Sequence, residues 1–243
     1  MDNIAISVEH VKKIYKLYDR NRDRLKDALG FSKKPLGKEH YALNDVSFQV
    51  GQGETVGIIG TNGSGKSTIL KIITGVLNPT DGEVKVNGRI SALLELGAGF
   101  NMEYTGIENI YLNGTVLGHS KKYMDEHFDE IVDFAELWDF LDTPIKNFSS
   151  GMTARLGFSV ATMVAPDILI CDEILAVGDY LFQQKCMERM NRMLSGGTTL
   201  LFVSHTIDTV RKLCDHAIWL DHGVAKMVGE VNEVCDAYMK LNR

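Results

Sequence analysis

The stretch that most restricts the fold of this chain is Gly60 to Ser67, which reads Gly-Thr-Asn-Gly-Ser-Gly-Lys-Ser. An apolar run, Thr55 to Ile59, precedes it, and Ser67 to Thr74 continues with helical periodicity. The glycines let successive backbone N–H groups turn inward around an anion, and the N-terminus of the following helix adds partial positive charge. The stretch therefore predicts a strand, a phosphate-binding loop and a helix in direct succession.

Two side chains of this loop offer chemistry of their own. Lys66 is expected to reach the β- and γ-phosphates of a nucleotide, and the Ser67 hydroxyl to bind Mg²⁺. Such a string arises by chance in roughly one chain in a hundred of this length, and the strand-to-helix context lowers that chance further. Nucleotide contacts are expected from Gly60, Thr61, Asn62, Gly63, Ser64, Gly65, Lys66, Ser67 and Thr68.

The composition is that of a folded protein without a basic surface. Of 243 residues, 44% are hydrophobic and 24% charged, with a formal charge of −6. This length can form one large α/β domain or two small ones. A net acidic chain lacks the positive footprint of general nucleic-acid binding, so no nucleic-acid partner is expected. The apolar runs are too short to span a bilayer, and the four cysteines form no Cys-x-x-Cys pair, which favours a cytosolic location.

Strand and helix patterns alternate along the rest of the chain. Ile4 to Val8, Ala42 to Val50 and Glu83 to Val86 are predicted strands, and the region from Thr105 to Asp142 has helical periodicity. A helix is predicted from Ser149 to about Val164. Later strands are predicted at Ile168 to Asp172, Thr199 to Ser204 and Ala217 to Leu220, with helices at Leu181 to Leu194 and Asp208 to Leu213. This alternation predicts a largely parallel sheet that binds ligands at the carboxyl ends of its strands.

Polar residues follow two of the apolar strands. Asp172 ends one strand and is suited to support Mg²⁺, directly or through water, and Glu173 would face the γ-phosphate and polarise a water molecule. His205 follows the strand from Thr199 to Ser204. In a parallel sheet it would lie at the same edge as Asp172, within reach of a γ-phosphate.

A second anion site is predicted at Ser149-Ser150-Gly151-Met152, immediately before a helix. Ser149 can cap that helix, while Ser150 and Gly151 expose backbone N–H groups. One phosphate loop together with a separate anion-binding helix start suggests two ATP molecules sandwiched between two copies of the chain.

In their order, these segments resemble an ATP-binding cassette (ABC) ATPase over nearly the whole chain. The Walker A loop is Gly60 to Ser67, the signature segment Phe148 to Met152, and the Walker B strand Ile168 to Asp172, followed by Glu173; His205 matches the switch histidine. The segment from Ala176 to Asp179 occupies the place of the D-loop. Tyr15 matches the aromatic residue that stacks on adenine, although Tyr18 competes for that role.

The resemblance implies an α/β fold with a P-loop NTPase (RecA-like) core, a mostly parallel sheet, an antiparallel β part and an inserted helical subdomain. We expect one nucleotide-binding domain over residues 1–243, with the core at about 1–95 and 160–243 and the helical subdomain at about 100–158. ATP and Mg²⁺ would bind between the loop of one copy and the signature helix of the other. The resemblance implies that Glu173 aligns the attacking water, His205 holds the γ-phosphate, and Lys66 with Mg²⁺ neutralises developing charge.

Two positions depart from the family pattern. The signature is Phe-Ser-Ser-Gly-Met instead of Leu-Ser-Gly-Gly-Gln, but Ser149 and Gly151 keep the anion-binding geometry. The Q-loop glutamine is missing, because no glutamine occurs between Gln52 and Gln183. Ser91 to Asn101 takes its place, and Glu95 is the best polar candidate there to approach Mg²⁺.

Three segments narrow the branch: residues 91–101, residues 172–179, and the insertion from Lys16 to Lys38. Together they resemble the ATPase subunits of bacterial polysaccharide and teichoic acid exporters of the O-antigen type. The resemblance implies an ATP hydrolase coupled to transport, working as a homodimer with an integral membrane permease at the cytoplasmic face of the bacterial inner membrane. The transported substrate would be a polyprenyl-pyrophosphate-linked glycan. Some such subunits have a C-terminal carbohydrate-binding domain, which is not expected here because the chain ends after a final helix.

Alternative functions remain open at this point. An exporter of drugs, ions or other small substrates would use the same cassette chemistry. A non-transport ABC protein acting on ribosomes or DNA usually has two cassettes or long coiled coils, and a nucleotide kinase would leave the signature helix unexplained. The insertion from Lys16 to Lys38, with eight basic and three acidic residues, is either a solvated loop or a site where Arg20, Arg22 and Arg24 meet anionic lipid or a lipid pyrophosphate.

Overall fold

The computed structural model describes residues 3–18, 20, 22, 25, 37–93, 97, 99–172, 178–204 and 206–241. Its internal contacts divide the chain into two compact units. Unit 1 consists of Met1–Gly51, Gly57–Asn87 and His205–Arg243, and unit 2 of Gln52–Val56 and Gly88–Ser204. Strand β3 (Thr55–Ile59) contributes residues to both units.

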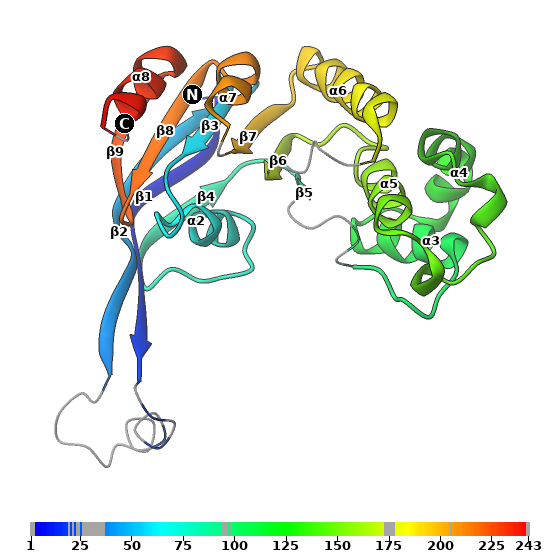
Figure 1. Ribbon diagram of the computed structural model, residues 1–243, viewed down its shortest axis with the longest axis horizontal. Coiled ribbons are helices and arrows are strands. Elements are labelled where there is room, and N and C mark those ends of the chain that lie inside the picture. Colours follow the sequence, from blue (N-terminus) through cyan, green and yellow to red (C-terminus); the bar gives the residue numbers. More distant parts are fainter. Residues whose placement is uncertain are drawn as a thin grey trace. The chain divides into compact units, whose positions relative to one another are not determined.

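Unit 1 contains an antiparallel sheet with the strand order β2-β1-β4. Strands β1 (Ile4–Leu17) and β2 (Lys38–Gly51) pair along their whole length, and β4 (Asp81–Val86) pairs with the first part of β1. Figure 1 shows β1 and β2 continuing side by side beyond β4 as a two-stranded ribbon. Cross-strand partners near its base, such as Ile6 and Val50, are fully buried.

The far half of this ribbon corrects the strand limits predicted from the sequence. We expected one strand to end at Val8 and the next to begin at Ala42, but β1 continues to Leu17 and β2 begins at Lys38, so the two strands reach the edges of the predicted polar insertion. Tyr15, Leu17 and Tyr41 lie within these strands and are 39%, 54% and 45% exposed. A ribbon that is exposed on both faces shows no alternation of apolar and polar residues, so the usual signal of a strand is absent.

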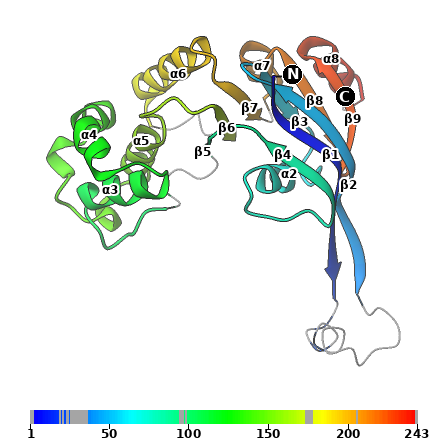
Figure 2. The ribbon, with the colours of Figure 1, turned by 180° about the vertical axis from the view of Figure 1, so that it is seen from behind.

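The other sheet of the chain has six strands in the order β5-β6-β7-β3-β8-β9, and unit 1 contributes the end of β3 with β8 (His216–Asp221) and β9 (Val224–Glu230). Strands β8 and β9 are antiparallel, and β9 was not predicted. Helix α8 (Val231–Leu241) packs on both of them and also contacts α7 (Ile207–Leu213), as Figure 2 shows from behind. Helix α2 (Lys66–Ile73) follows β3 through the phosphate loop.

Unit 2 contains the parallel strands of the chain. Strands β5 (Ile90–Leu93), β6 (Ile168–Asp172) and β7 (Thr199–Val203) are parallel neighbours, and the Leu200 N–H donates to the carbonyl of Glu54 just before β3. Nearly every residue of β6 and β7 is buried. Parallel strands covered on both faces read as continuous apolar runs, which is why β6 and β7 were predicted closely. Strand β5 was not predicted.

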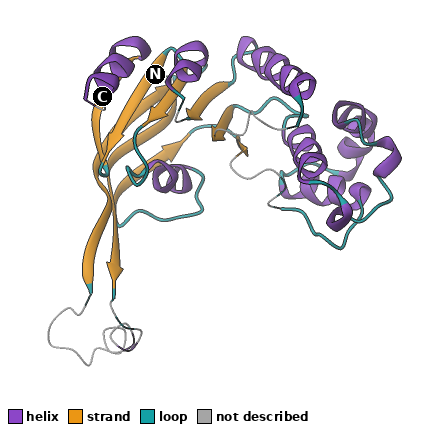
Figure 3. Cartoon of the chain, viewed as in Figure 1, coloured by secondary structure: helices purple, strands orange, loops and turns teal. Residues whose placement is uncertain are grey.

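The rest of unit 2 is helical, as expected between Thr105 and Asp142. Its helices are α3 (Gly106–Val116), α4 (Lys121–Ala135), α5 (Ser150–Ala161) and α6 (Tyr180–Ser195), with short 3₁₀ turns η1 (Trp138–Phe140) and η2 (Ile145–Asn147). Figure 3 shows α3, α4 and α5 gathered without any strand among them. Their shared core comprises Ile110, Met124, Ile131, Val132, Ala135, Leu137, Leu141, Ile145, Leu156, Val160 and Met163.

Two further expectations concern membrane insertion and the polar insertion. No helix within the described ranges is long and apolar enough to cross a bilayer. Most of the predicted insertion from Lys16 to Lys38 falls outside the described residues.

Candidate nucleotide-binding site

The phosphate loop lies between β3 and α2 in unit 1, and its glycines fit the conformations the backbone requires. Gly63 has φ +80° and Gly65 has φ +106°, in the left-handed region that disfavours side chains. At Gly63 a Cβ would meet nothing within 4 Å, so this part of the loop is open. At Gly65, the N-cap of α2, a Cβ would lie 2.7 Å from the carbonyl oxygen of Ala42.

The loop is held from two sides by its neighbours in unit 1. The Gly223 N–H, in the turn between β8 and β9, donates to the Ser64 carbonyl at 2.9 Å. The Asn44 N–H of β2 donates to the Gly223 carbonyl at 2.7 Å. A Cβ on Gly60 would lie 2.2 Å from the carbonyl oxygen of Leu220. These contacts fix the loop before it binds a ligand, which reduces the ordering cost of binding.

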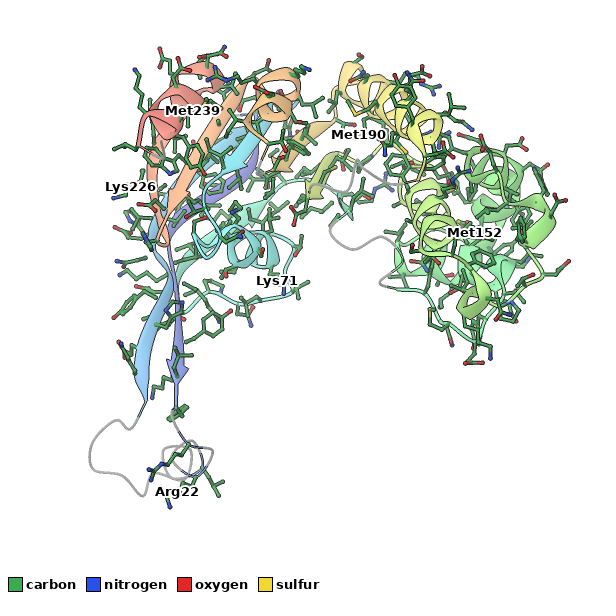
Figure 4. The ribbon with its side chains drawn as sticks, viewed as in Figure 1. Arg22, Lys71, Met152, Met190, Lys226 and Met239 are labelled. Carbon is green, nitrogen blue, oxygen red and sulfur yellow. The ribbon has the colours of Figure 1, made fainter. Side chains whose placement is uncertain are left out.

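Lys66 is 7% exposed, and its ammonium group is held over the loop. Its Nζ donates to the carbonyl oxygens of Gly60 at 2.7 Å and of Thr61 at 2.9 Å. The first turn of α2 contains no acidic residue, so its N–H groups and dipole favour an anion. Figure 4 labels Lys71 in the last turn of the same helix, where a cation complements the negative end of the dipole.

The mouth of the loop is accessible. Thr61, Asn62, Gly63 and Ser67 are exposed, while Thr68 is half-buried. A buried cation, inward-turning glycines and an exposed hydroxyl at the helix start form the donor set that a nucleoside triphosphate with Mg²⁺ requires. The loop therefore fits this ligand by its geometry as well as by its sequence.

Tyr15 lies on the β1–β2 ribbon opposite His40. Its ring is exposed, with the Lys13 Nζ 5.5 Å from the ring centroid. Ala42, which approaches Gly65 of the loop, is two residues beyond His40 on the same strand, or about 7 Å along it. The backbone of Tyr15 is thus a short distance along the ribbon from the strand position that packs on the loop, and its stacking on adenine stays a prediction. Tyr18 is half-buried, whereas Tyr15 leaves more of its ring open.

The second predicted anion site is the N-terminus of α5 in unit 2. Ser149 is the N-cap, and its Oγ accepts a hydrogen bond from the Met152 N–H at 3.2 Å. Ser150 is exposed, and a Cβ on Gly151 would meet only the Ser149 Oγ at 3.8 Å. The first turn has no acidic residue. Met152, labelled in Figure 4, packs against the helical core and anchors this turn. The structure confirms the helix start and the Ser149 cap, and anion binding at this turn stays a prediction.

Asp172 ends β6 and is half-buried, beside Val203 in the register of β7. Glu173, His205 and Glu95 lie outside the described residues, so their expected roles remain predictions. Among the described residues of the D-loop place, Asp179 is the N-cap of α6, and its carboxylate accepts a hydrogen bond from the Phe182 N–H at 3.0 Å. Unit 1 thus brings together the loop and Tyr15, and unit 2 contains the signature turn, Asp172 and Asp179.

The sequence interpretation missed one residue of this arrangement. Arg155 of α5 donates to Asp179 and to Glu136, and its side chain is 18% exposed. Both partners are distant in sequence, so no local motif marks the pairing. The available signal was an arginine beside the buried apolar residues Leu156 and Phe158, because a cation at such a position requires an acidic partner.

Comparisons with known proteins agree with this geometry. The model of the family described as "ABC transporter" matches residues 43–176. The O-antigen export system ATP-binding protein RfbB of Klebsiella pneumoniae is 46% identical over 96% of this chain and 97% of its own length. The teichoic acids export ATP-binding protein TagH of Bacillus anthracis is 45% identical over 97% of this chain, which spans 42% of that relative.

Solved structures show the same fold. The ATP-binding subunit of an ABC transporter superimposes with a TM-score of 0.76 at 24% identity, covering 97% of this chain and 93% of that one. A dimeric ATP-binding cassette in a post-hydrolysis state, bound to ADP and Pi, gives 0.73 at 23% identity, covering 93% and 98% of the two chains. With a matching family model over more than half its length, this chain belongs to the ABC transporter family.

Proposed function

We propose that this chain is the ATP-hydrolysing subunit of a transporter that exports a lipid-linked cell-surface polysaccharide of the O-antigen or teichoic acid type. The observation that supports it most is the buried ammonium of Lys66 over an open glycine loop, in a chain that matches an O-antigen export ATPase from end to end. The chain acts as one nucleotide-binding domain. The alternative functions, export of drugs or ions and a role outside transport, would use the same loop. Neither of the two curated relatives described above is named for such a function.

The residues of the loop bind and orient the nucleotide. Backbone N–H groups from Gly60 to Ser67 surround the phosphates, and Lys66 exchanges its bonds to loop carbonyls for bonds to charged phosphate oxygens. The Tyr15 ring stacks on the adenine. Mg²⁺ would be held by the Ser67 hydroxyl and the Asp172 carboxylate, with Glu95 supporting it through water, and when bound it would supply neutralisation of phosphate charge.

Hydrolysis in this proposal needs two copies of the chain. The open N–H groups of Ser150 and Gly151 bind the γ-phosphate of ATP held by the loop of the other copy. Glu173 orients the attacking water, and His205 donates a hydrogen bond to the γ-phosphate. These groups act by position and electrostatics, which is the general mode of catalysis in phosphoryl transfer.

Closure of the two copies on ATP would drive a separate integral membrane permease at the cytoplasmic face of the bacterial inner membrane. The transported substrate is a polyprenyl-pyrophosphate-linked glycan. The names of two relatives, which refer to O-antigen export and to teichoic acids export, support a cell-surface polymer as the substrate.

The test is copurification of the chain with its permease, followed by reconstitution in vesicles. ATP hydrolysis is then measured with a lipid-linked glycan, with the lipid pyrophosphate alone and with a panel of small drug-like cations. Stimulation by the lipid-linked glycan alone is the expected result. Stimulation by a drug-like cation, with no response to the glycan, would contradict polysaccharide export while leaving ATP hydrolysis intact.

A further inference from the structure

Arg155 is a largely buried cation on α5 that joins three helices of unit 2. Its Nη1 donates to the Glu136 Oε2 at 3.0 Å, and its Nη2 donates to the Asp179 carboxylate. The guanidinium carbon lies 4.8 Å from the centroid of the Phe182 ring, at cation–π distance. The planar fork of an arginine suits this use, because it can hold two carboxylates in fixed directions.

Glu136, one of the two carboxylates, is the C-cap of α4 and has φ +58°. A left-handed conformation is unfavourable for a glutamate and persists only where surrounding contacts enforce it. Here the carboxylate accepts hydrogen bonds from the Lys185 Nζ at 2.6 Å and from Arg155. These partners, Lys185 first and then Arg155, lower the pKa of Glu136. The contacts hold the end of α4 against both α5 and α6.

Asp179, the other carboxylate, begins α6 at the end of the D-loop place. The hydrogen bond from the Phe182 N–H, followed by the charge of Arg155, lowers the pKa of Asp179. The preceding Gly178 has φ +74°, and a Cβ there would lie 3.2 Å from the Phe182 ring and 3.4 Å from the Arg155 Nε. The chain therefore leaves the D-loop place in a tight turn that is packed against Arg155.

Arg155 lies on the same helix as the signature turn, five residues after Ser150, or about 8 Å along the axis. A helix transmits a displacement of its N-terminus to such a position as a rigid body. We propose that Arg155 is a positioning residue of the nucleotide site, which holds the signature turn of α5 and the segment ending at Asp179 in one fixed arrangement. Binding of a γ-phosphate at Ser150 then sets the positions of Gly178 and Asp179. This inference rests on the proposed sandwich of ATP between two copies.

Arg189 of α6 offers a matched control. Its side chain is 12% exposed, its Nη2 donates to the Glu130 Oε1 at 2.6 Å, and its guanidinium carbon lies 4.2 Å from the Phe134 ring centroid. It therefore has the burial, the ion pair and the aromatic contact of Arg155. Its carboxylate partner lies within α4, and its Nη1 donates to the Thr162 carbonyl at 3.5 Å, at the far end of α5 from the signature turn. Among the described residues it has no hydrogen bond or ion pair with the signature turn or with Asp179. Loss of Arg189 measures the structural cost of removing such a group.

The experiment uses the full chain with Glu173→Gln, which is expected to accumulate an ATP-bound dimer. Affinity of the monomer for ATP is measured by equilibrium dialysis, dimer dissociation by sedimentation velocity, and thermal unfolding by circular dichroism. Arg155→Met should leave the ATP affinity of the monomer unchanged and weaken the ATP-bound dimer about tenfold, a coupling typical of contacting residues in one network. Asp179→Asn should weaken the dimer by a similar factor. The double variant, Arg155→Met with Asp179→Asn, should weaken it no further than either single variant does. Arg155→Lys, which keeps the charge but not the fork, should restore only part of the loss.

The Arg189 control separates a loss of positioning at Asp179 from a general loss of stability. Arg189→Met should lower the unfolding temperature as much as Arg155→Met does and leave dimer dissociation unchanged. The inference is overturned if Arg155→Met dimerises as tightly as its parent, if Arg189→Met weakens the dimer equally, or if the Arg155 and Asp179 effects add. A Glu173→Gln parent that forms no dimer with ATP would instead overturn the proposed function, and the inference with it.

Discussion

The carbonyl oxygens of Gly60 and Thr61 already hold the ammonium of Lys66 over the phosphate loop. A phosphate oxygen is a stronger acceptor for this cation than a neutral carbonyl, so nucleotide binding replaces two bonds by better ones. The lysine does not need to be desolvated at that moment, because it is already buried. At the scale of residues, the site is therefore largely organised by the fold of unit 1.

The two glycines of the loop should respond differently to substitution. Gly63→Ala meets open space and has only the strain of a positive φ, which costs about 1–2 kcal/mol. Gly65→Ala adds a collision with the carbonyl oxygen of Ala42, 2.7 Å away, and should destabilise unit 1 by more than about 3 kcal/mol. Urea unfolding of both variants checks the difference, and equal destabilisation would contradict the described packing of Gly65 on β2.

The elements were predictable from the sequence to different degrees, for physical reasons. Strands β6 and β7 were confirmed almost to the residue, because buried parallel strands are uninterrupted apolar runs. The far half of the β1–β2 ribbon was missed, because neither of its faces is buried. Strand β9 was missed as well: its exposed residues, such as Lys226, Val228 and Glu230, include both apolar and charged side chains and show no clear polar face.

The site residues that the sequence predicted are likewise those that belong to a local pattern. Lys66, Ser149 and Asp172 belong to local motifs, and the structure describes each where its motif predicted it. The contact of Arg155 with Asp179 spans 24 residues and depends on how α5 and α6 pack. Packing between helices is a tertiary property, which a local pattern does not encode.

The packing of α4 against its neighbours should weaken at acid pH. The Lys185 hydrogen bond and the Arg155 charge hold the pKa of Glu136 below the ordinary value of a glutamate. A carboxyl with a depressed folded pKa contributes stability at pH values above its unfolded pKa, and that contribution is lost as pH falls through the folded pKa. Glu136→Gln should therefore reduce the fall in unfolding temperature between about pH 5 and pH 3.

The control for this measurement is Glu126→Gln, which removes another carboxylate from α4. Among the residues that the structure describes, Glu126 forms a long ion pair of 3.8 Å with Lys122, and its side chain is 56% exposed. The Glu126 variant should keep the pH dependence of the parent chain. A parent-like pH profile in the Glu136 variant would contradict the assigned ionic role of Glu136.

Among the elements, the ribbon formed by β1 and β2 bears on the role of the basic insertion. It projects beyond its own sheet and leads into the basic segment, where Arg20 and Arg22 are exposed. Anionic lipid attracts each such residue by about 1 kcal/mol. Changing Arg20, Arg22 and Arg24 to Ala should lower glycan-stimulated ATP hydrolysis in vesicles and leave basal hydrolysis nearly unchanged. Unchanged glycan stimulation of ATP hydrolysis in the triple variant would indicate that the segment is a solvated loop with no part in lipid binding.

At the scale of the whole molecule, the phosphate loop and the signature turn are two proposed anion sites, one in each unit of the chain. Each has a helix start without an acidic first turn. In the proposed dimer, the loop of one chain binds the nucleotide, and the signature turn of its partner completes the site. Neither anion site should therefore hydrolyse ATP without the other.

The dependence of each anion site on the other can be tested by mixing two defective chains. Lys66→Ala removes the buried cation of the loop, and Gly151→Asp places a carboxylate in the open space of the signature turn, where it repels phosphate. Each variant alone should be inactive, because each homodimer has two damaged sites. A mixture should regain part of the ATP hydrolysis, since its heterodimers contain one composite site with an intact loop and an intact signature turn. Hydrolysis at the unmodified rate by either variant alone would contradict the account.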